Sequence, residues 1–187
     1  MRVLALADKR PLLDPATMAR QRHVDAVFCL GDLDRAWIES LLLLKKIPRY
    51  GVHGNHDPED VLRELEIEDL HLRRTRVAGG LTVVGFEGCV QYRRHAPYQY
   101  TQREANKLVK RLPAADVLLC HCPPLGINDD PEDPAHIGFE ALRDWVDRHQ
   151  PRHVLHGHTH PMPGRTVKSY GDTHVHYVSG AQILDLH

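Results

Sequence analysis

This sequence of 187 residues lacks most of the features that would place it in a specialised class of protein. Its four cysteines, Cys29, Cys89, Cys120 and Cys122, are too few and too irregularly spaced for a disulfide framework, and we expect them to be reduced. Its 24 basic and 25 acidic residues nearly cancel. This balance argues against a basic groove for nucleic acid and against attraction to an anionic membrane.

Long apolar runs are also missing. The run Leu41–Leu44, like every other apolar run in the sequence, is far shorter than the roughly 20 residues of a membrane-spanning helix. The apolar amino terminus, Met1–Ala7, stops at Asp8 and is too short for the apolar region of a secretory signal peptide. We therefore expect a cytoplasmic protein without a membrane segment, and the length suits one domain over residues 1–187.

Histidine, in contrast, is abundant. The sequence has 15, and many of them lie in short groups beside apolar runs. Neutral imidazoles are preferred ligands of transition metals, so each group is a candidate part of a metal site.

Short apolar segments in the first third of the chain predict buried strands that end in polar residues. Strands expected at 2–7, 25–30 and 47–53 are separated by helices expected at 14–22 and 35–44. This alternation is typical of a mostly parallel sheet, in which the carboxyl ends of all strands lie at one edge. The polar residues that follow these strands should therefore meet in space.

The rest of the chain predicts further elements of both kinds. We expect helices at 58–66, 99–112 and 138–149, a hairpin around Gly79–Gly80, and buried strands at 116–120 and 153–155. Three last strands, at 164–170, 174–179 and 182–186, are expected to be antiparallel. The segment 125–136 is too polar and too rich in proline for regular structure, which predicts a long loop beside the strand ends.

The polar residues at the expected strand ends form one set of metal donors. They are Asp8, Asp32, Asn55 with His56, His121, and His158 with His160. Carboxylates, imidazoles and an amide oxygen together suit a borderline divalent ion such as Mn, Fe or Zn. Two such ions can share a carboxylate, for which Asp32 is the natural bridge, and can support hydrolysis of a phosphate ester.

At this point the sequence resembles a known family. The blocks Gly31-Asp32, Gly54-Asn55-His56-Asp57, a lone His121 after an apolar strand, and Gly157-His158-Thr159-His160 occur in the order and rough spacing of the calcineurin-like metallophosphoesterase superfamily, over residues 8–160. Within it, the segment 117–127 with the later His136-Ile137-Gly138 looks like the small phosphodiesterase branch with a TH-x-PP-x-G loop.

The resemblance implies a fold and a cofactor. The fold is of the α/β class, a four-layer αββα sandwich with mixed central sheets, and the cofactor is a pair of divalent transition metal ions (Mn, Fe or Zn), with manganese favoured. The implied ligands are Asp8, Asp32 and His160 for the first ion, and Asp32, Asn55, His121 and His158 for the second.

The resemblance further implies the acid of the reaction. His56 would protonate the leaving oxygen while Asp57 holds its ring, because an imidazole beside a carboxylate can carry a proton near neutral pH. Asn55 and His56 would also contact the substrate. We expect His158 and His160 on one face of a strand end, at the spacing that chelation needs.

One position departs from the family pattern. The family usually opens with Asp-x-His, whereas this chain has Asp8-Lys9-Arg10. A guanidinium has no acceptor lone pair, so Arg10 cannot be a metal ligand. Two outcomes are open: Arg10 clamps the substrate phosphate beside a weakened first site, or its charge replaces the first ion and leaves one metal. We favour two ions, because Asp8 and His160 would otherwise have little to do.

Other residues near the site have alternative interpretations. His53 and His156 precede the glycine of their loops and are candidates for supporting the ligands. Cys120 and Cys122 flank His121, where packing in the core is favoured over a zinc clip because Cys-x-Cys lacks the usual ligand spacing. His136 is expected to be an ordinary loop residue.

The sequence therefore predicts a metal-dependent phosphoesterase, in particular a phosphodiesterase that hydrolyses a small phosphoester or nucleotide by attack of a metal-bound hydroxide. The alternative is a catalytically weak or inactive binding or scaffold module of the same fold. The neutral net charge favours a small substrate over a polymer.

Overall fold

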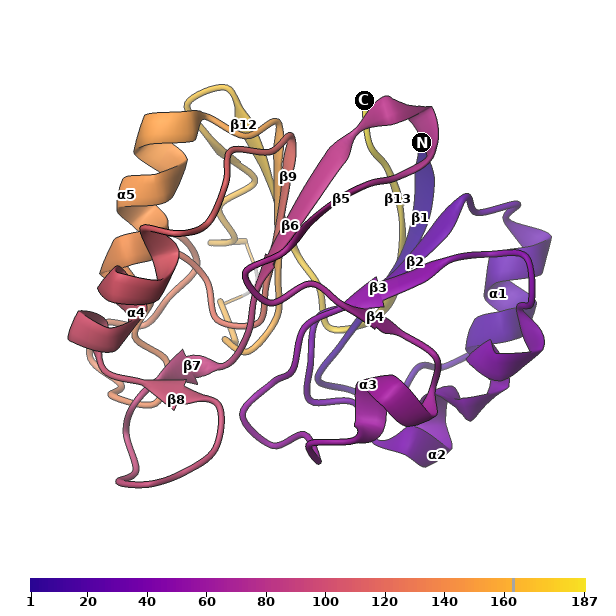
Figure 1. The fold of residues 1–187 in the computed structure, drawn as a ribbon, viewed down its shortest axis with the longest axis horizontal. Helices are drawn as coiled ribbons and strands as arrows, with labels where there is room; N and C mark the ends of the chain where they lie inside the picture. Colours follow the sequence, from indigo (N-terminus) through magenta and orange to yellow (C-terminus); the bar gives the residue numbers. More distant parts are fainter. Residues whose placement is uncertain (163) are drawn as a thin grey trace.

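The protein is described by a computed structural model that covers residues 1–162 and 164–187. Two large β-sheets face each other, and helices lie on the outer face of each sheet (Figure 1). This arrangement confirms the expected four-layer αββα sandwich with mixed sheets.

The first sheet combines four strands from residues 2–69 with the last strand of the chain. Its strand order is β13-β1-β2-β3-β4, with β1–β4 parallel and β13 antiparallel to β1. The strands are β1 (Arg2–Ala7), β2 (Ala26–Cys29), β3 (Arg49–Gly51), β4 (Glu68–Asp69) and β13 (Gly180–Asp185). Helices α1 (Pro15–Gln21), α2 (Arg35–Ile38) and α3 (Val61–Glu64) cover its outer face (Figure 1).

The second sheet has the order β11-β12-β10-β9-β6-β5, and its four inner strands are parallel. The strands are β5 (Arg74–Arg76), β6 (Thr82–Phe86), β9 (Val117–Cys120), β10 (His153–His156), β11 (Ser169–Tyr170) and β12 (Thr173–Tyr177). Helices α4 (Gln102–Val109) and α5 (Glu140–His149) cover its outer face. A small parallel pair, β7 (Cys89–Val90) and β8 (Gln99–Tyr100), lies beside it.

Burial on both faces explains why the strands read as continuous apolar runs. In β1, Val3 and Ala5 pack between the sheets, whereas Leu4 and Leu6 pack under the helices of the first sheet, and all four are fully buried. Each buried leucine contributes roughly 1.5–3 kcal/mol relative to an exposed one. These runs fix the positions of the strand ends that carry the polar residues.

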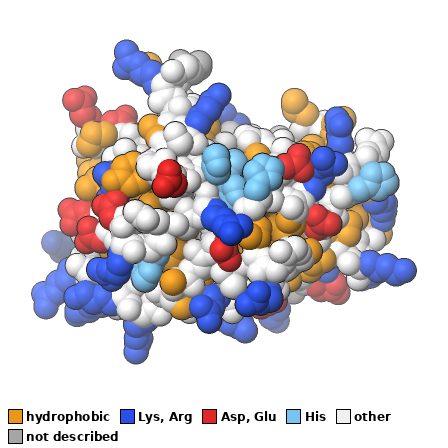
Figure 2. Space-filling model, turned by 90° about the horizontal axis from the view of Figure 1, so that it is seen from above, with side chains coloured by type: hydrophobic (Ala, Val, Ile, Leu, Met, Phe, Trp, Pro, Cys, Tyr) orange, Lys and Arg blue, Asp and Glu red, His pale blue; other side chains and the backbone are white. Residues whose placement is uncertain are grey.

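The surface agrees with the balanced composition. On the end of the molecule that carries both chain termini, acidic and basic side chains are interspersed, and histidine side chains gather there (Figure 2). None of the helices in the described residues is long and apolar enough to cross a membrane.

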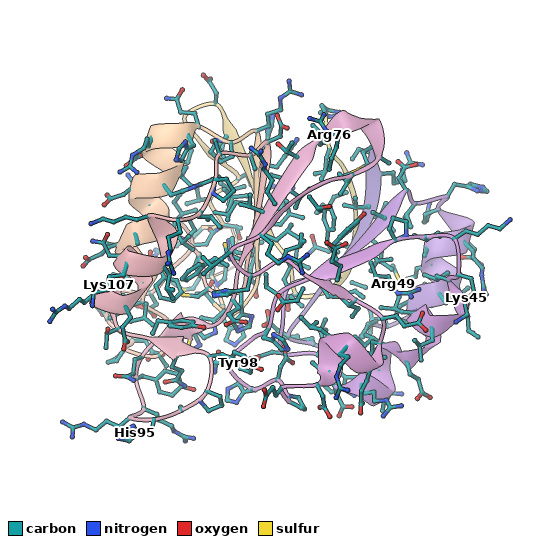
Figure 3. All side chains as sticks on the ribbon, in the orientation of Figure 1. Lys45, Arg49, Arg76, His95, Tyr98 and Lys107 are labelled. Atoms are coloured by element: carbon teal, nitrogen blue, oxygen red, sulfur yellow. The ribbon has the colours of Figure 1, made fainter. Side chains whose placement is uncertain are left out.

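The helix predicted at 35–44 is shorter than expected. Helix α2 ends at Ile38, and residues Glu39–Leu43 form a 3-10 helix. The buried guanidinium of Arg49 (Figure 3) supports this tighter turn, because its Nη1 donates to the carbonyl oxygens of Leu41 and Leu44 at 2.9 Å each. The same two carbonyls also accept the backbone N–H groups of Leu44 and Ile47.

The prediction that the last three strands are antiparallel is wrong in part. Strand β12 pairs in parallel with β10, and β13 leaves the second sheet to pair antiparallel with β1. The connection between β10 and β12 is long enough to return the chain to the amino end of β10, so that β12 can run parallel to it.

Candidate metal centre

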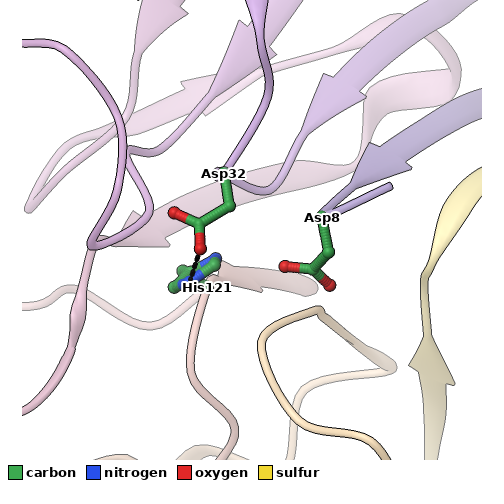
Figure 4. Close-up of side chains that lie close together, drawn as sticks. All are labelled: Asp8, Asp32 and His121. Atoms are coloured by element: carbon green, nitrogen blue, oxygen red, sulfur yellow. Dashed lines mark ion pairs between the residues drawn. The ribbon is translucent and has the colours of Figure 1, made fainter. Parts of the chain in front are cut away.

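Three of the predicted ligands meet where parallel strands end. Asp8 directly follows β1, Asp32 lies just beyond β2, and His121 directly follows β9 (Figure 4). One ligand atom from each lies within 4.8 Å of the others. We call Asp8, Asp32 and His121 the mixed cluster, because it joins carboxylates from the first sheet to an imidazole from the second.

The backbone at these positions is unusual. Asp8 and Asp32 have φ values of 58° and 53°, and His158 has a φ of 66°. Left-handed conformations are strained for residues other than glycine, and they concentrate at functional sites.

Two glycines allow the loops that carry the site to approach each other. A Cβ on Gly54 would lie 2.1 Å from Asp32 Oδ1, and a Cβ on Gly31 would lie 2.2 Å from the backbone nitrogen of Gly54 and 2.8 Å from His121 Nδ1. Neither glycine could carry a real side chain at such distances. Steric contacts therefore explain why glycine precedes Asp32 and why glycine precedes Asn55.

His121 is fully buried and has its ring fixed from one side. Its Nδ1–H donates to the carbonyl oxygen of Leu30 at 2.7 Å, which directs Nε2 toward Asn55 Oδ1 at 3.1 Å and Asp32 Oδ2 at 3.5 Å. In neutral His121 all three of these atoms are acceptors. A cation satisfies them together, so the donor set fits a transition metal.

Charge explains the protonation behaviour of the mixed cluster. Burial raises the pKa of Asp8 to about 6. Burial also opposes the charged form of Asp32, but the hydrogen bond and charge of His121 outweigh it and leave the pKa of Asp32 lowered. For His121 burial acts in the other direction, yet Asp32 and Asp8 raise its pKa to about 9. In the absence of metal, the imidazolium thus takes the place of a cation between two carboxylates.

Asn55 and His56 lie at the edge of the mixed cluster. Asn55 is buried, and its Nδ2 donates to the hydroxyl of Tyr92 at 3.2 Å, which fixes the direction of its oxygen. His56 is exposed, and its backbone N–H donates to Asp32 Oδ1 at 2.8 Å. Sequence reasoning missed Tyr92, and its place in a loop rich in Arg and Tyr gave no signal for this contact.

Asp57 has a different position from the one expected. Its carboxylate accepts hydrogen bonds from the backbone N–H groups of Asp32 (3.0 Å), Leu33 (2.9 Å) and Gly54 (2.7 Å). No hydrogen bond between Asp57 and the ring of His56 occurs among the described residues. The carboxylate of Asp57 therefore links the loop that contains Asp32 to the loop that contains Gly54, instead of hydrogen bonding to the ring of His56.

The expectation that His158 and His160 share a strand face is wrong, because β10 ends at His156 and His158 has a left-handed backbone. The backbone N–H of His158 donates to both oxygens of Asp8, and its Nε2–H donates to the carbonyl oxygen of Ala135 at 2.7 Å. Its ring lies 4.8 Å from that of His121. His160 is exposed and is not part of the mixed cluster.

His136 lies closer to the site than expected. Its ring centroid is 5.2 Å from that of His158 and 5.5 Å from that of His160, and its Nδ1–H donates to Asp133 at 2.6 Å. His136 and His160 line a cavity of about 670 Å³ together with acidic residues of the long loop, including Asp129. The predicted loop over 125–136 thus borders the site.

Arg10 is exposed and lies beside the first sheet. It lines a surface cavity of about 470 Å³ with Leu12, Met18 and Ala181. Among the residues that the structure describes, its side chain has no hydrogen-bond or ion-pair partner.

The four cysteines are free and buried, as expected.

Solved structures share this fold at low sequence identity. One has a TM-score of 0.68 and 18% identity, and the match covers 98% of this chain and 94% of the other. The crystal structure of TT1561 of Thermus thermophilus has a TM-score of 0.62 and 17% identity, with 96% of this chain and 89% of the other covered. These likenesses concern the fold alone.

No curated protein matches the chain. The family model described as calcineurin-like phosphoesterase matches residues 6–162, which include every residue of the predicted site. The chain belongs to the calcineurin-like phosphoesterase family, whose members are metal-dependent phosphoesterases.

Proposed function

We propose that this protein is a phosphodiesterase that hydrolyses a small phosphoester or nucleotide with two divalent transition metal ions, manganese favoured. The observation that carries the proposal is the convergence of His121 Nε2, Asn55 Oδ1 and Asp32 Oδ2, a donor set that fits a transition metal. Family membership supports the reaction class. The resemblance of the segment 117–127 to the small phosphodiesterase branch supports the diester.

The chain offers donors for both ions. Asp8, Asp32 and His160 would hold the first, and Asp32, Asn55, His121 and His158 would hold the second. Bound there, the ions would supply Lewis acid stabilisation of the phosphoryl oxygens and a lowered pKa for a reacting water. His158 can serve because its Nε2–H is taken by Ala135, which leaves the lone pair of Nδ1 free.

The exposed His56 is proposed as the general acid. Its backbone N–H donates to Asp32 Oδ1 at 2.8 Å, which holds the backbone of His56 next to the mixed cluster. From there, the ring would donate its proton to the leaving oxygen of the substrate. Asn55, oriented by Tyr92, would contact the phosphate as well as the metal.

The shape and charge of the neighbouring cavity support a small substrate. A volume of about 670 Å³ suits one small leaving group, and its lining carries four acidic residues, Asp129, Asp130, Glu132 and Asp133, against one basic residue, Arg165. Carboxylates in this position would repel the further phosphates of a nucleic acid. Arg10 lines a separate cavity with Met18 and Ala181, so a contact with the phosphate would require its side chain to swing toward the site.

Hydrolysis of bis-p-nitrophenyl phosphate and p-nitrophenyl phosphate with added Mn²⁺ tests the proposal. We expect turnover of the diester above the monoester, and a loss of roughly 10²–10⁴-fold in kcat for His56→Ala. Asn55→Ala should lose activity together with metal, whereas His95→Ala, which alters an exposed histidine between β7 and β8, should not. Absence of metal-dependent turnover on either ester would favour an inactive scaffold.

The metal count tests the role of Arg10. We expect two ions per chain in the wild-type protein and in Arg10→His, with tighter binding of the first ion in the variant because a repelling cation is removed. One ion per chain that rises to two in Arg10→His would show that the guanidinium replaces the first metal.

A further inference from the structure

A second group of histidines and carboxylates lies where the two sheets meet on the side of β3 and β6. His53 lies two residues beyond β3, Asp69 ends β4, and Glu87 directly follows β6. One ligand atom from each of these three side chains lies within 4.8 Å of the others. We call them the His53 cluster. It shares no residue with the mixed cluster.

The ring of His53 is buried without a satisfied nitrogen. The residue is 6% exposed, and neither Nδ1 nor Nε2 has a hydrogen-bond partner among the described residues. Its Nδ1 lies 3.3 Å from Glu87 Oε2, which is close enough for an ion pair but outside hydrogen-bond geometry. An imidazole that loses its water and gains no partner costs free energy unless another group completes the site.

Neighbouring aromatic rings hold these side chains in place. The ring of Tyr98 is stacked on His53, with a centroid distance of 4.6 Å and an interplanar angle of 4°, and Figure 3 shows Tyr98 between the two halves of the sandwich. The hydroxyl of Tyr100 donates to Glu87 Oε1 at 2.5 Å. The donor atoms are thus oriented before any ligand binds.

His71 completes the surroundings of the cluster without being needed as a ligand. Its Nδ1 accepts the backbone N–H of Glu87 at 3.2 Å, and its own backbone N–H donates to Asp69 Oδ1 at 2.8 Å. His71 therefore fixes both carboxylate-bearing residues. Carboxylate oxygens on Asp69 and Glu87 stay available on the side of His53.

We propose that His53, Asp69 and Glu87 bind a zinc ion that joins the two sheets. One imidazole and two carboxylates are suitable zinc ligands, and three protein ligands leave a fourth position for water. A calcium or magnesium ion is disfavoured, because both prefer shells made of oxygen alone.

Such an ion would act on the loop that carries Asn55. His53 lies two residues before Asn55. The carbonyl oxygen of His53 accepts a hydrogen bond at 2.8 Å from the backbone N–H of Gly88, the residue after Glu87. Zinc bound to the side chains of the His53 cluster would add a second link to this backbone hydrogen bond between the segments that follow β3 and β6. The inference is independent of the proposed reaction, since it concerns other residues and another ion.

Zinc content decides between a metal site and a metal-free ion pair of His53 with Glu87. The full-length protein is stripped with a chelator, reloaded with zinc and dialysed, and zinc per chain is measured by mass spectrometry. We expect Glu87→Gln to lose one zinc relative to wild type. His53→Phe, which keeps a ring to stack on Tyr98, should lose the same ion, whereas His95→Gln should lose none.

Zinc measured in variants that also carry Asp32→Asn distinguishes this site from the mixed cluster. Asp32→Asn should keep one zinc more than the double variant Asp32→Asn/Glu87→Gln, and added zinc should raise its melting temperature by more. Equal zinc content with and without Glu87→Gln, or with and without His53→Phe, in folded proteins would overturn the proposal and leave the ion pair. Cobalt absorption in the same variants gives a second readout that does not depend on activity.

Discussion

His121, at the carboxyl ends of the strands of the second sheet, behaves in the opposite way both to its neighbour His158, whose pKa burial lowers to about 3, and to a group of histidines at the amino ends. At the carboxyl ends of the strands, His121 of the mixed cluster lies between two carboxylates that raise its pKa to about 9. At the amino ends, four histidines lie close to one another. They are His153, His174, His176 and His187, which we call the histidine cluster.

The difference lies in the neighbours and not in the residue type. Burial, with the like charges of His153 and His174, lowers the pKa of His176 to about 4, and burial also lowers that of His153. The Nδ1–H of His153 donates to His176 Nε2 at 3.2 Å, so both rings are held neutral. In this chain the carboxylates beside His121 therefore set it apart from the histidine cluster, where no carboxylate is among the causes of the lowered pKa values.

The largest effect should follow from removing a carboxylate of the mixed cluster. Asp32→Asn takes away the expected bridge between two metals, and we expect kcat/KM on bis-p-nitrophenyl phosphate to fall by at least about 10³-fold. Asp34→Asn is a matched control, because Asp34 caps helix α2 through Ala36 and lies outside the cluster. An equal loss in both variants would contradict the special role of Asp32.

Asp57→Asn tests whether this carboxylate ties loops together or tunes His56. Because three backbone N–H groups lose an ionised acceptor, we expect the free energy of unfolding to fall by about 2 kcal/mol. The measurement is denaturant unfolding, accompanied by the pH profile of kcat. A shift of the acidic or basic limb with unchanged stability would instead place Asp57 on the ring of His56.

Tyr92→Phe should have a smaller effect on the same site. The variant removes the hydroxyl that orients the amide of Asn55, and we expect roughly a tenfold loss of metal affinity with little change in fold. Tyr50→Phe is the control, since Tyr50 packs against Phe28 away from the site. Unchanged metal affinity in Tyr92→Phe would mean that Asn55 needs no such support.

The smallest expected effect concerns the histidine cluster and pH. The folded pKa of His176 is depressed, so its contribution to stability is complete above the unfolded value of about 6.5 and is lost as pH falls toward about 4. The other groups that face this cluster, Arg152 and the remaining histidines, also carry positive charge when protonated.

Thermal unfolding of the metal-free protein between pH 7 and pH 4.5 measures this loss. We expect the melting temperature to fall by a few degrees, and to fall less steeply in His176→Gln. The carboxylate of Asp116, which precedes β9, accepts from Thr82 and lies 3.7 Å from Arg152 Nε, so it partly offsets the charge of Arg152. An identical pH dependence in His176→Gln would show that His176 does not titrate in this range.

The sequence predicted the mixed cluster because its residues follow apolar strands directly. Asp8, Asp32 and His121 are placed by the strand ends, and strand ends are readable from short apolar runs. The four-layer fold followed from the family resemblance and was confirmed. These features depend on local pattern and on the geometry that parallel strands share.

Features that depend on loop backbones and on packing between sheets were not predictable in the same way. The left-handed backbone of His158 directs its Nε2–H to Ala135, and no spacing rule shows this. The carboxylate of Asp57 bonds to amides that lie 24 and 25 residues earlier in the chain. The His53 cluster forms only because β3 and β6 belong to sheets that pack together, so its members look unrelated in the sequence.

Anomalous diffraction from crystals grown with MnCl₂ tests the central claim most directly. We predict a manganese peak in contact with Asp32 and His121 Nε2, and a second peak on the side of Asp8. Manganese peaks elsewhere with none beside Asp32 would contradict the assignment of the mixed cluster as the metal centre.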